Sequence, residues 1–361
     1  MIRNTIDYCD DLSLLIDRKK RTQPNGLIIG SSGSGKTILA KQEIIDVFLK
    51  TADDIIICCD SEREYLPLVQ EFNGQVIELS FDSSQHINPM DITIDIPIEE
   101  TYRFIEYKSD FLQTFCELII GGGLEPTERS IIDKCVKRIY KKFFENEPTP
   151  DKMPILSDLY RELKSEGEIA VRLCYALDIY VNGILKIFNH HTNIASNRVI
   201  CFDVGKLFQY CDIGMLFVSE FVWNKIKVKT GKCTRYYLEE IYCLFKEEAT
   251  AKYIAQLWVN ARTNNCIITA ITQNLEDLFS SEELKSIVYN VGFIYLLNQR
   301  RENREILVEK LGLSENLIES VINIEFGRGI VICGDTVLPL DVRIQPDTKL
   351  YNLLISNSWN G

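Results

Sequence analysis

The chain has 361 residues, 46% of them hydrophobic and 25% charged, with a formal net charge of −12. The composition is ordinary for a globular protein, and the length suggests two or three domains. No stretch approaches the roughly 18–20 consecutive apolar residues that a membrane-spanning helix needs. The acidic net charge argues against sequence-independent binding to DNA phosphates, although a basic channel could form locally or in an oligomer.

The first segments of the chain predict a strand, a loop and a helix. Residues 1–25 are polar and charged and form a lead-in segment, residues 26–29 are a short apolar run typical of a strand, and residues 38–49 have helical spacing. Between strand and helix lies a complete G-x-x-x-x-G-K-[ST] motif, made of Gly30, Ser31, Ser32, Gly33, Ser34, Gly35, Lys36 and Thr37. The alternative is a flexible Gly/Ser-rich turn, but the flanking strand and helix favour a phosphate-binding loop.

The residue types of this motif indicate its chemistry. Glycines allow successive backbone N–H groups to face one point, which forms a nest for phosphate oxygens at a helix N-terminus. Lys36 can reach the β- and γ-phosphates, and the Thr37 hydroxyl is a hard ligand suited to Mg²⁺. A GTPase is disfavoured because residues 224–227 lack the Asp of N-K-x-D, and an ABC-type ATPase because L-S-G-G-Q is missing. The sequence therefore predicts an ATP and Mg²⁺ site.

The following segments divide into α/β and all-helical parts. Residues 54–60 form a continuous β-branched run typical of a strand buried on both faces, and residues 74–79 predict a shorter strand. Residues 97–195 then read as an inserted helical subdomain, with helical patterns at 99–120, 130–144, 156–163 and 168–180.

Strands return after the helical block. Helical stretches separate them, which is the alternation expected of a parallel sheet, and a final hairpin with a Gly-Asp turn closes the fold. The predicted class is therefore α/β, with a core formed by residues 26–96 and 196–361. The predicted strands are residues 197–204, 235–240, 266–273 and 292–298, and those of the hairpin are residues 329–335 and 337–340.

Hydrolysis of a nucleotide needs an acidic group at the end of a neighbouring strand. Asp60, Asp203 and the pair Glu239-Glu240 each end an apolar run. The pair is favoured because Glu239 can face Mg²⁺ through its water while Glu240 orients or deprotonates the attacking water. The alternative is an acidic strand end before a solvated helix start.

Gln273 ends the next predicted strand. Its side chain can contact the γ-phosphate or the attacking water and report loss of the phosphate. The alternative is a simple strand-to-helix cap made by Thr272 or Asn274.

An ordered set of segments resembles the C-terminal ATPase domain of the VirB-four family, the TraC- and TraE-like ATPases of conjugation and type IV secretion. The phosphate-binding loop is shared by many ATPases, so the specific part is the set as a whole, which runs from about residue 12 to the end. The matching segments are residues 24–30, 54–57, 62–65, 87–92 (Ile-Asn-Pro-Met-Asp-Ile), 202–204, 236–240, Trp258 with Ala261 and Arg262, 271–278, 297–299 and 347–351.

The resemblance implies a RecA-like core related to the FtsK and HerA motors, an inserted all-α subdomain and a ring, often a hexamer, with ATP between subunits. A neighbour's arginine then offsets charge on the transferring phosphoryl group. Arg262 is the first choice, and a solvated surface cation is the alternative. The other candidates are Arg300, Arg301, Arg304 and Arg328.

Two departures from the family pattern bear on function. The family usually has Asp-Glu where this chain has Glu239-Glu240, and its large N-terminal domain is absent from this sequence, so the chain is either an excised fragment or a shortened paralogue. The leading hypothesis is an ATPase that energises assembly of, or transfer through, a conjugative type IV secretion apparatus. The alternatives are an ATP-dependent assembly scaffold with little hydrolysis and a DNA-pumping motor.

The expected partners are further copies of the chain and other secretion components, with DNA possible but not implied by charge. The expected location is cytoplasmic, at the inner face of the cell membrane through partners or a missing N-terminal domain. Twelve cysteines without a C-x-x-C pair and a start without signal-peptide anatomy agree with a reducing compartment.

Overall fold

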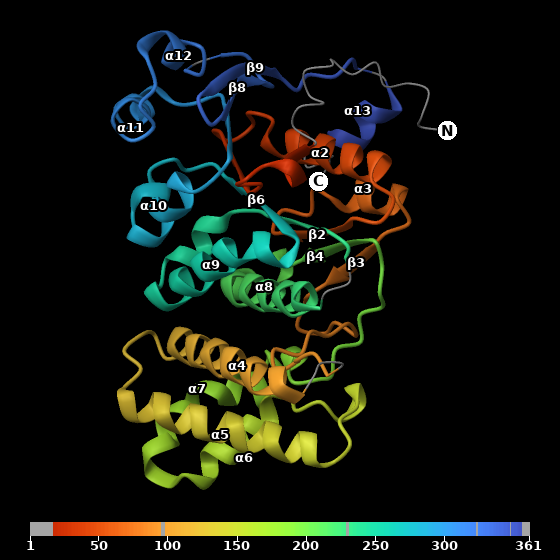
Figure 1. Ribbon diagram of the computed structural model, residues 1–361, viewed down its shortest axis with the longest axis vertical. Coiled ribbons are helices and arrows are strands. Elements are labelled where there is room, and N and C mark those ends of the chain that lie inside the picture. The colour runs from red at the N-terminus through yellow and green to blue at the C-terminus, as the bar shows by residue number, and fades with distance from the viewer. Residues whose placement is uncertain (1–16, 95–97, 229–230, 323, 347, 356–361) are drawn as a thin grey trace. The chain divides into compact units, whose positions relative to one another are not determined.

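The computed structural model describes residues 17–94, 98–228, 231–322, 324–346 and 348–355 (Figure 1). Most of the lead-in segment, and Asp347 of the family likeness, therefore lie outside the described residues. The nine strands of the described part form a mixed, mostly parallel sheet, which confirms the predicted α/β class. The chain divides into two compact units, each described below by itself.

The first unit holds the described residues up to Ile56, Lys232–Ile241 and those from Ala261 on. Its strand order is β5-β6-β1-β7-β8-β9, in which β5, β6, β1 and β7 are parallel and the β8–β9 hairpin is antiparallel. Its elements are β1 (Gly26–Ile29), α2 (Lys36–Lys50), β5 (Thr234–Leu238), β6 (Cys266–Thr272), α10 (Glu282–Tyr289), β7 (Phe293–Leu297), α11 (Arg304–Glu309), α12 (Glu315–Glu319), β8 (Arg328–Cys333), β9 (Thr336–Asp341) and α13 (Lys349–Leu354).

The second unit holds Ile57–Gly231 and Tyr242–Asn260. Within it β3 and β4 pair in parallel, and β2 follows β4 in the strand order. Its elements are β2 (Ile55–Asp60, which starts at the boundary), α3 (Leu66–Glu71), β3 (Gln75–Glu78), α4 (Ile98–Ile119), α5 (Pro126–Glu145), α6 (Leu156–Ser165), α7 (Val171–Val181), β4 (Val199–Asp203), α8 (Cys211–Lys227) and α9 (Glu248–Ala261).

The predicted helical block forms four helices, α4 to α7, which pack against one another (Figure 1). No described residue between 98 and 198 belongs to a strand. The compact unit that holds these helices also holds β3, β4 and α8, and within it buried Lys108 of α4 forms an ion pair with Glu220 of α8. The boundaries of a separate inserted subdomain therefore stay a prediction.

The apolar runs form the buried strands, and polar side chains tie the helix after the loop into the first unit. Leu27, Ile28 and Ile29 of β1 are fully buried. Within α2, Lys41 Nζ donates to the Leu354 carbonyl at 3.1 Å, and Gln42 Nε2 donates to the Val342 carbonyl at 3.0 Å. These two bonds join the helix to the C-terminal part of the chain. They also give the buried Lys41 and Gln42 donors hydrogen-bond partners, without which their burial would cost free energy.

Arg18 is a structural residue that the sequence pattern did not reveal. Its side chain is fully buried and donates to Glu43 Oε1 at 2.6 Å, to Thr269 Oγ1 at 2.9 Å and to the Pro24 carbonyl at 2.6 Å. A Cβ on Gly26 would lie 2.8 Å from this guanidinium. The end of the polar lead-in is thus anchored beside the start of β1.

No helix in the described part of the chain is both long and apolar enough to cross a membrane.

Candidate functional site

The G-x-x-x-x-G-K-[ST] loop leaves the carboxyl end of β1, which lies between β6 and β7. Ile29 is level with Thr272 on one side and with Leu296 on the other. The Gly30 N–H donates to the Thr272 carbonyl at 3.3 Å. The Ser31 N–H and hydroxyl both donate to the Asn298 carbonyl, at 2.9 and 3.0 Å. Both neighbouring strands therefore anchor the start of the loop.

Glycine is required at three loop positions for different reasons. Gly33 and Gly35 have φ values of 71° and 102°, in the left-handed region that disfavours side chains. A Cβ on Gly30 would lie 2.3 Å from Ser34 Oγ, which leaves no room for one. The Ser34 N–H closes the turn by donating to the Ser31 carbonyl at 3.1 Å. The loop therefore curls back over the start of α2.

The donors of the loop fit a polyphosphate. Ser34 Oγ is buried and has no hydrogen-bond partner among the described residues. Since buried hydroxyl groups normally have a partner, this hydroxyl is available to a ligand. Lys36 Nζ lies across the loop, 3.2 Å from the Ser31 carbonyl oxygen. Thr37 is in the first turn of α2, where the helix dipole favours an anion. This donor set suits phosphate oxygens, with the Thr37 hydroxyl available to a hard cation such as Mg²⁺.

Glu239 and Glu240 leave the same sheet edge as the loop. β5 ends at Leu238, one residue before the pair and two before the predicted strand end, and it is parallel to β6, which pairs with β1. Glu239 is 6% exposed, whereas Glu240 is half-buried and has a φ of 47°. A left-handed backbone is costly for a long side chain, so the fold holds Glu240 in a strained position at the sheet edge from which the loop also leaves.

Gln273 is exposed and directly follows β6, at the same edge as the loop. Thr272 and Asn274, the residues of the alternative cap, form local hydrogen bonds, but the following 3-10 helix (Asp277–Phe279) has Glu276 at its N-cap position and no side-chain cap. Thr272 Oγ1 accepts from the Asn274 N–H at 3.3 Å, and Asn274 Nδ2 donates to Asp277 Oδ2 at 2.7 Å. The role of Gln273 towards the γ-phosphate therefore stays a prediction.

Arg262 is not brought together with the loop. It begins a short 3-10 helix (Arg262–Asn264) before β6, and its side chain is exposed. In parallel strands the amino and carboxyl ends lie at opposite edges, so Arg262 is at the edge away from Gly30 and Gln273. Within one copy of the chain Arg262 therefore cannot contact a phosphate bound at the loop, and only a contact with the site of another copy stays open.

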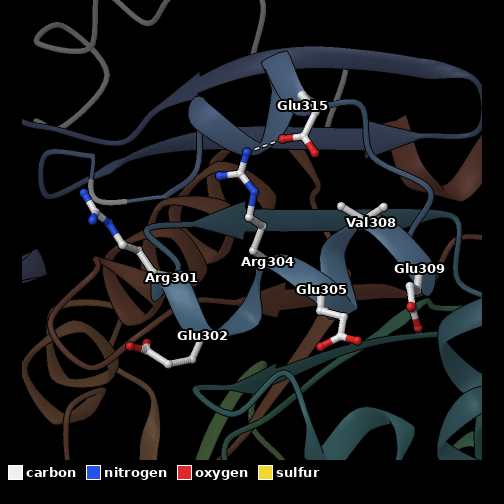
Figure 2. Close-up of a pocket in the computed structure, with 7 residues that line it drawn as sticks. All are labelled: Arg301, Glu302, Arg304, Glu305, Val308, Glu309 and Glu315. Carbon is white, nitrogen blue, oxygen red and sulfur yellow. Dashed lines mark hydrogen bonds and ion pairs between the residues drawn. The ribbon is translucent and has the colours of Figure 1, made fainter.

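Of the other candidate arginines, Arg304 and Arg328 are held by carboxylates. Figure 2 shows Arg304 of α11 directed at Glu315 of α12. Arg304 also contacts Glu319 at 2.7 Å and lines a hollow of about 440 Å³. Arg328 contacts Glu325 at 3.2 Å. Arg300 and Arg301 are exposed. The hollow is lined by Arg301, Glu302, Arg304, Glu305, Val308, Glu309 and Glu315. With four carboxylates against two guanidiniums, it repels a phosphate.

Asp60 and Asp203, the alternative acids, have structural partners within the second unit. Asp60 accepts the Tyr65 N–H at 3.0 Å and the Glu62 N–H at 3.1 Å, and burial raises its pKa. Asp203 contacts Arg63 Nε at 2.8 Å, and burial raises its pKa despite that cation. Both carboxylates therefore stabilise the turns that follow their strands.

Gln299 is a positioning residue that the sequence analysis did not single out. Its buried side chain donates to the Ile29 carbonyl at 3.2 Å and to the Leu297 carbonyl at 3.0 Å, which joins the ends of β1 and β7. Neighbouring Asn298 has a buried Oδ1 without a hydrogen-bond partner among the described residues. The only sequence signal for these positions was the family likeness of residues 297–299.

A strand, a glycine-rich loop and a helix at the carboxyl edge of a mostly parallel sheet define a P-loop nucleotide-binding fold with a RecA-like core. Among solved structures, the chain is similar to VirB4 of Thermoanaerobacter pseudethanolicus, with a TM-score of 0.79, 22% identity and 94% of each chain covered.

The bacterial conjugative coupling protein TrwB is also similar. Its complex with a non-hydrolysable ATP analogue has a TM-score of 0.58 and 12% identity, covering 92% of this chain and 87% of the other. Its complex with ADP and Mg²⁺ has a TM-score of 0.55 and 12% identity, covering 91% and 87%. No protein-family model and no curated protein sequence matches the chain. The likeness to VirB4 expected from the sequence is thus confirmed at the level of the fold.

Proposed function

We propose that the chain is an ATP-binding and ATP-hydrolysing motor domain of a conjugative type IV secretion apparatus. The observation that carries this proposal is the loop from Gly30 to Thr37, held between β6 and β7 with Glu239 and Glu240 at the same edge of the sheet. The fold shared with VirB4 and TrwB supports the choice of ATP, Mg²⁺ and conjugation.

In this proposal the residues divide the work of phosphoryl transfer. The loop N–H groups, the Ser34 hydroxyl and Lys36 bind the β- and γ-phosphates, and Glu240 accepts a proton from the attacking water. Gln273 orients that water or the γ-phosphate. Thr37 would bind Mg²⁺ through its hydroxyl and Glu239 would hold one of the waters of the ion, which would supply positive charge against the phosphate oxygens.

The proposed partners are further copies of the chain in a ring and other secretion components, which would bring the domain to the inner face of the cell membrane. Arg262 is the proposed arginine donated to a neighbour's site. The scaffold alternative is favoured by one observation, the Glu at position 239 where the resembled family has Asp. Binding of ATP without measurable turnover would select the scaffold, and stimulation by DNA would select a DNA-pumping motor.

The first test is Mg·ATP binding by calorimetry to the wild type and to Lys36→Ala. We expect a large loss of affinity, because Lys36 is the cation of the phosphate nest. Lys50→Ala is the matched control, since Lys50 is an exposed lysine at the other end of the same helix. Wild-type affinity in Lys36→Ala would refute the assignment of the loop.

A further inference from the structure

The segment around Gly327, before β8, lies directly against the phosphate-binding loop. The Gly327 N–H donates to the Ser34 carbonyl at 3.1 Å, and the Val342 N–H donates to the Gly327 carbonyl at 2.7 Å. Gly327 has a φ of 76°, and a Cβ there would lie 2.7 Å from Arg343 Cγ. This position therefore requires glycine, and the tight turn at Gly327 fixes the position of the preceding residue, Phe326.

That preceding side chain is Phe326, an aromatic ring beside the loop. Phe326 Cε2 lies 3.6 Å from the position that a Cβ on Gly35 would take, at the last glycine before Lys36. The side chain is nevertheless 46% exposed. A single exposed apolar side chain is common at a protein surface, so the informative feature is the position of this ring next to the loop, where it is available to an apolar part of a ligand.

The charged neighbours of the ring are already paired. Glu325 contacts Arg328 at 3.2 Å and Arg343 at 3.0 Å, and Arg343 also pairs with Asp341. These pairs join residues on both sides of Phe326 and hold the turn that presents it. The free face of the ring is therefore an apolar surface beside a nest built for phosphates.

We propose that Phe326 is the stacking platform for the nucleobase of the nucleotide whose phosphates occupy the loop. The inference rests on the proposed nucleotide site and adds to it the subsite for the base. A nucleoside triphosphate has one flat, apolar part, its base, attached through the ribose to phosphates that fit the loop. A phenyl ring offers no hydrogen bond, so stacking on it favours every base to a similar degree.

The test compares two ligands, Mg·ATP and Mg·tripolyphosphate, which share the phosphates and differ by the nucleoside. Calorimetry of Phe326→Ala should show a loss of roughly 5- to 150-fold in affinity for ATP, the range measured for removal of a base-stacking aromatic, and no loss for tripolyphosphate. GTP should weaken by a similar factor. Phe326→Trp should restore ATP binding, because the indole retains a stacking face.

Tyr289→Ala is the matched control, since Tyr289 of α10 is another exposed aromatic, at 62%. It should leave the affinities for both ligands unchanged, and thermal unfolding checks that every variant folds. Wild-type ATP affinity in Phe326→Ala would overturn the stacking role alone. An equal loss for tripolyphosphate would also overturn it, because the ring would then only support the loop. Failure of the wild type to bind either ligand would overturn the proposed function together with this inference.

Discussion

Glu240 has a left-handed backbone, with a φ of 47°, just after the end of β5, at the sheet edge from which the phosphate-binding loop also leaves. Glycine would adopt this conformation at lower cost, so the glutamate side chain needs a reason to be there. The proposed activation of the attacking water by its carboxylate would be such a reason. The strain thus adds a structural argument to the pattern that first indicated the acidic pair.

We expect Glu240→Gln to bind Mg·ATP as the wild type does and to lose about 10²- to 10⁴-fold in turnover, the usual contribution of a general base. The amide keeps the shape and backbone of the site but cannot accept the proton. Binding is measured by calorimetry and turnover by single-turnover phosphate release. Glu239→Asp is the companion variant and should keep or raise the rate, because it restores the residue usual in the resembled family.

The part of the site that a local sequence motif encodes could be predicted from the sequence. The motif from Gly30 to Thr37 encodes its turn and its donors locally, and the strand before it and helix after it are where they were expected. Gln299 could not be predicted in this way. Its contacts with the ends of β1 and β7 exist only after strands far apart in the sequence are paired.

Among the elements, α4 and α8 are joined by a buried ion pair. Lys108 and Glu220 are 1% and 2% exposed, and Lys108 Nζ also donates to the Pro89 carbonyl at 2.8 Å. Lys108→Met should lower the free energy of unfolding by about 3–5 kcal/mol, because it leaves the Glu220 carboxylate buried without its cation.

Urea denaturation measures that loss. Lys137→Met is the control, since Lys137 forms an exposed pair with Asp133 at 2.7 Å and such pairs contribute about 0–1 kcal/mol. Equal effects of the two substitutions would show that the buried pair does not hold α4 to α8.

A second link between these helices depends on pH. Lys227 Nζ of α8 lies 4.1 Å from the ring centre of Tyr107, 4.7 Å from that of Trp223 and 5.1 Å from that of Phe104. Burial lowers the pKa of Lys227 to about 7, although Glu220 favours the charged form and Lys108 and Arg103 oppose it. The folded protein therefore binds fewer protons than the unfolded chain between about pH 7 and the ordinary lysine value of 10.5.

Because the unfolded chain binds more protons in that window, the contribution of Lys227 to stability rises from pH 7 to pH 10. Lys227→Met removes this titration. Its melting temperature relative to the wild type should therefore be highest near pH 7 and fall steadily towards pH 10. Thermal unfolding of both proteins across this range measures the difference, and a pH-independent difference would contradict the lowered pKa.

At the scale of the whole molecule, local sequence patterns predicted the secondary-structure elements. Runs of β-branched residues predicted strands, and helical spacing of apolar residues predicted α4 to α7. The boundaries of the inserted helical subdomain stay a prediction, and α4 and α8 share one compact unit. Lys108 and Glu220 join them over 112 residues, and no local pattern records such a contact. For the same reason the buried Arg18 read as part of a polar lead-in segment.

Assembly is the prediction that belongs to this scale. Arg262 lies at the edge of β6 away from the loop and is exposed, so it can serve a phosphate only in another copy of the chain. An arginine supplied by a neighbour adds about 10³- to 10⁵-fold to the rate in the GTPase systems where it is known. We expect the ATPase activity per molecule to rise with protein concentration as rings form, as followed by light scattering. Arg262→Ala should abolish this rise without changing ATP binding.

The account depends most directly on ATP hydrolysis at the sheet edge that the loop shares with Glu240. Phosphate release from Mg·ATP, measured on the wild type, Lys36→Ala and Glu240→Gln at a protein concentration that favours assembly, tests this claim. We predict steady release by the wild type and almost none by either variant, with ATP still bound by Glu240→Gln. Release by Glu240→Gln at the wild-type rate would contradict the account, because the groups at this edge would then not carry out the reaction.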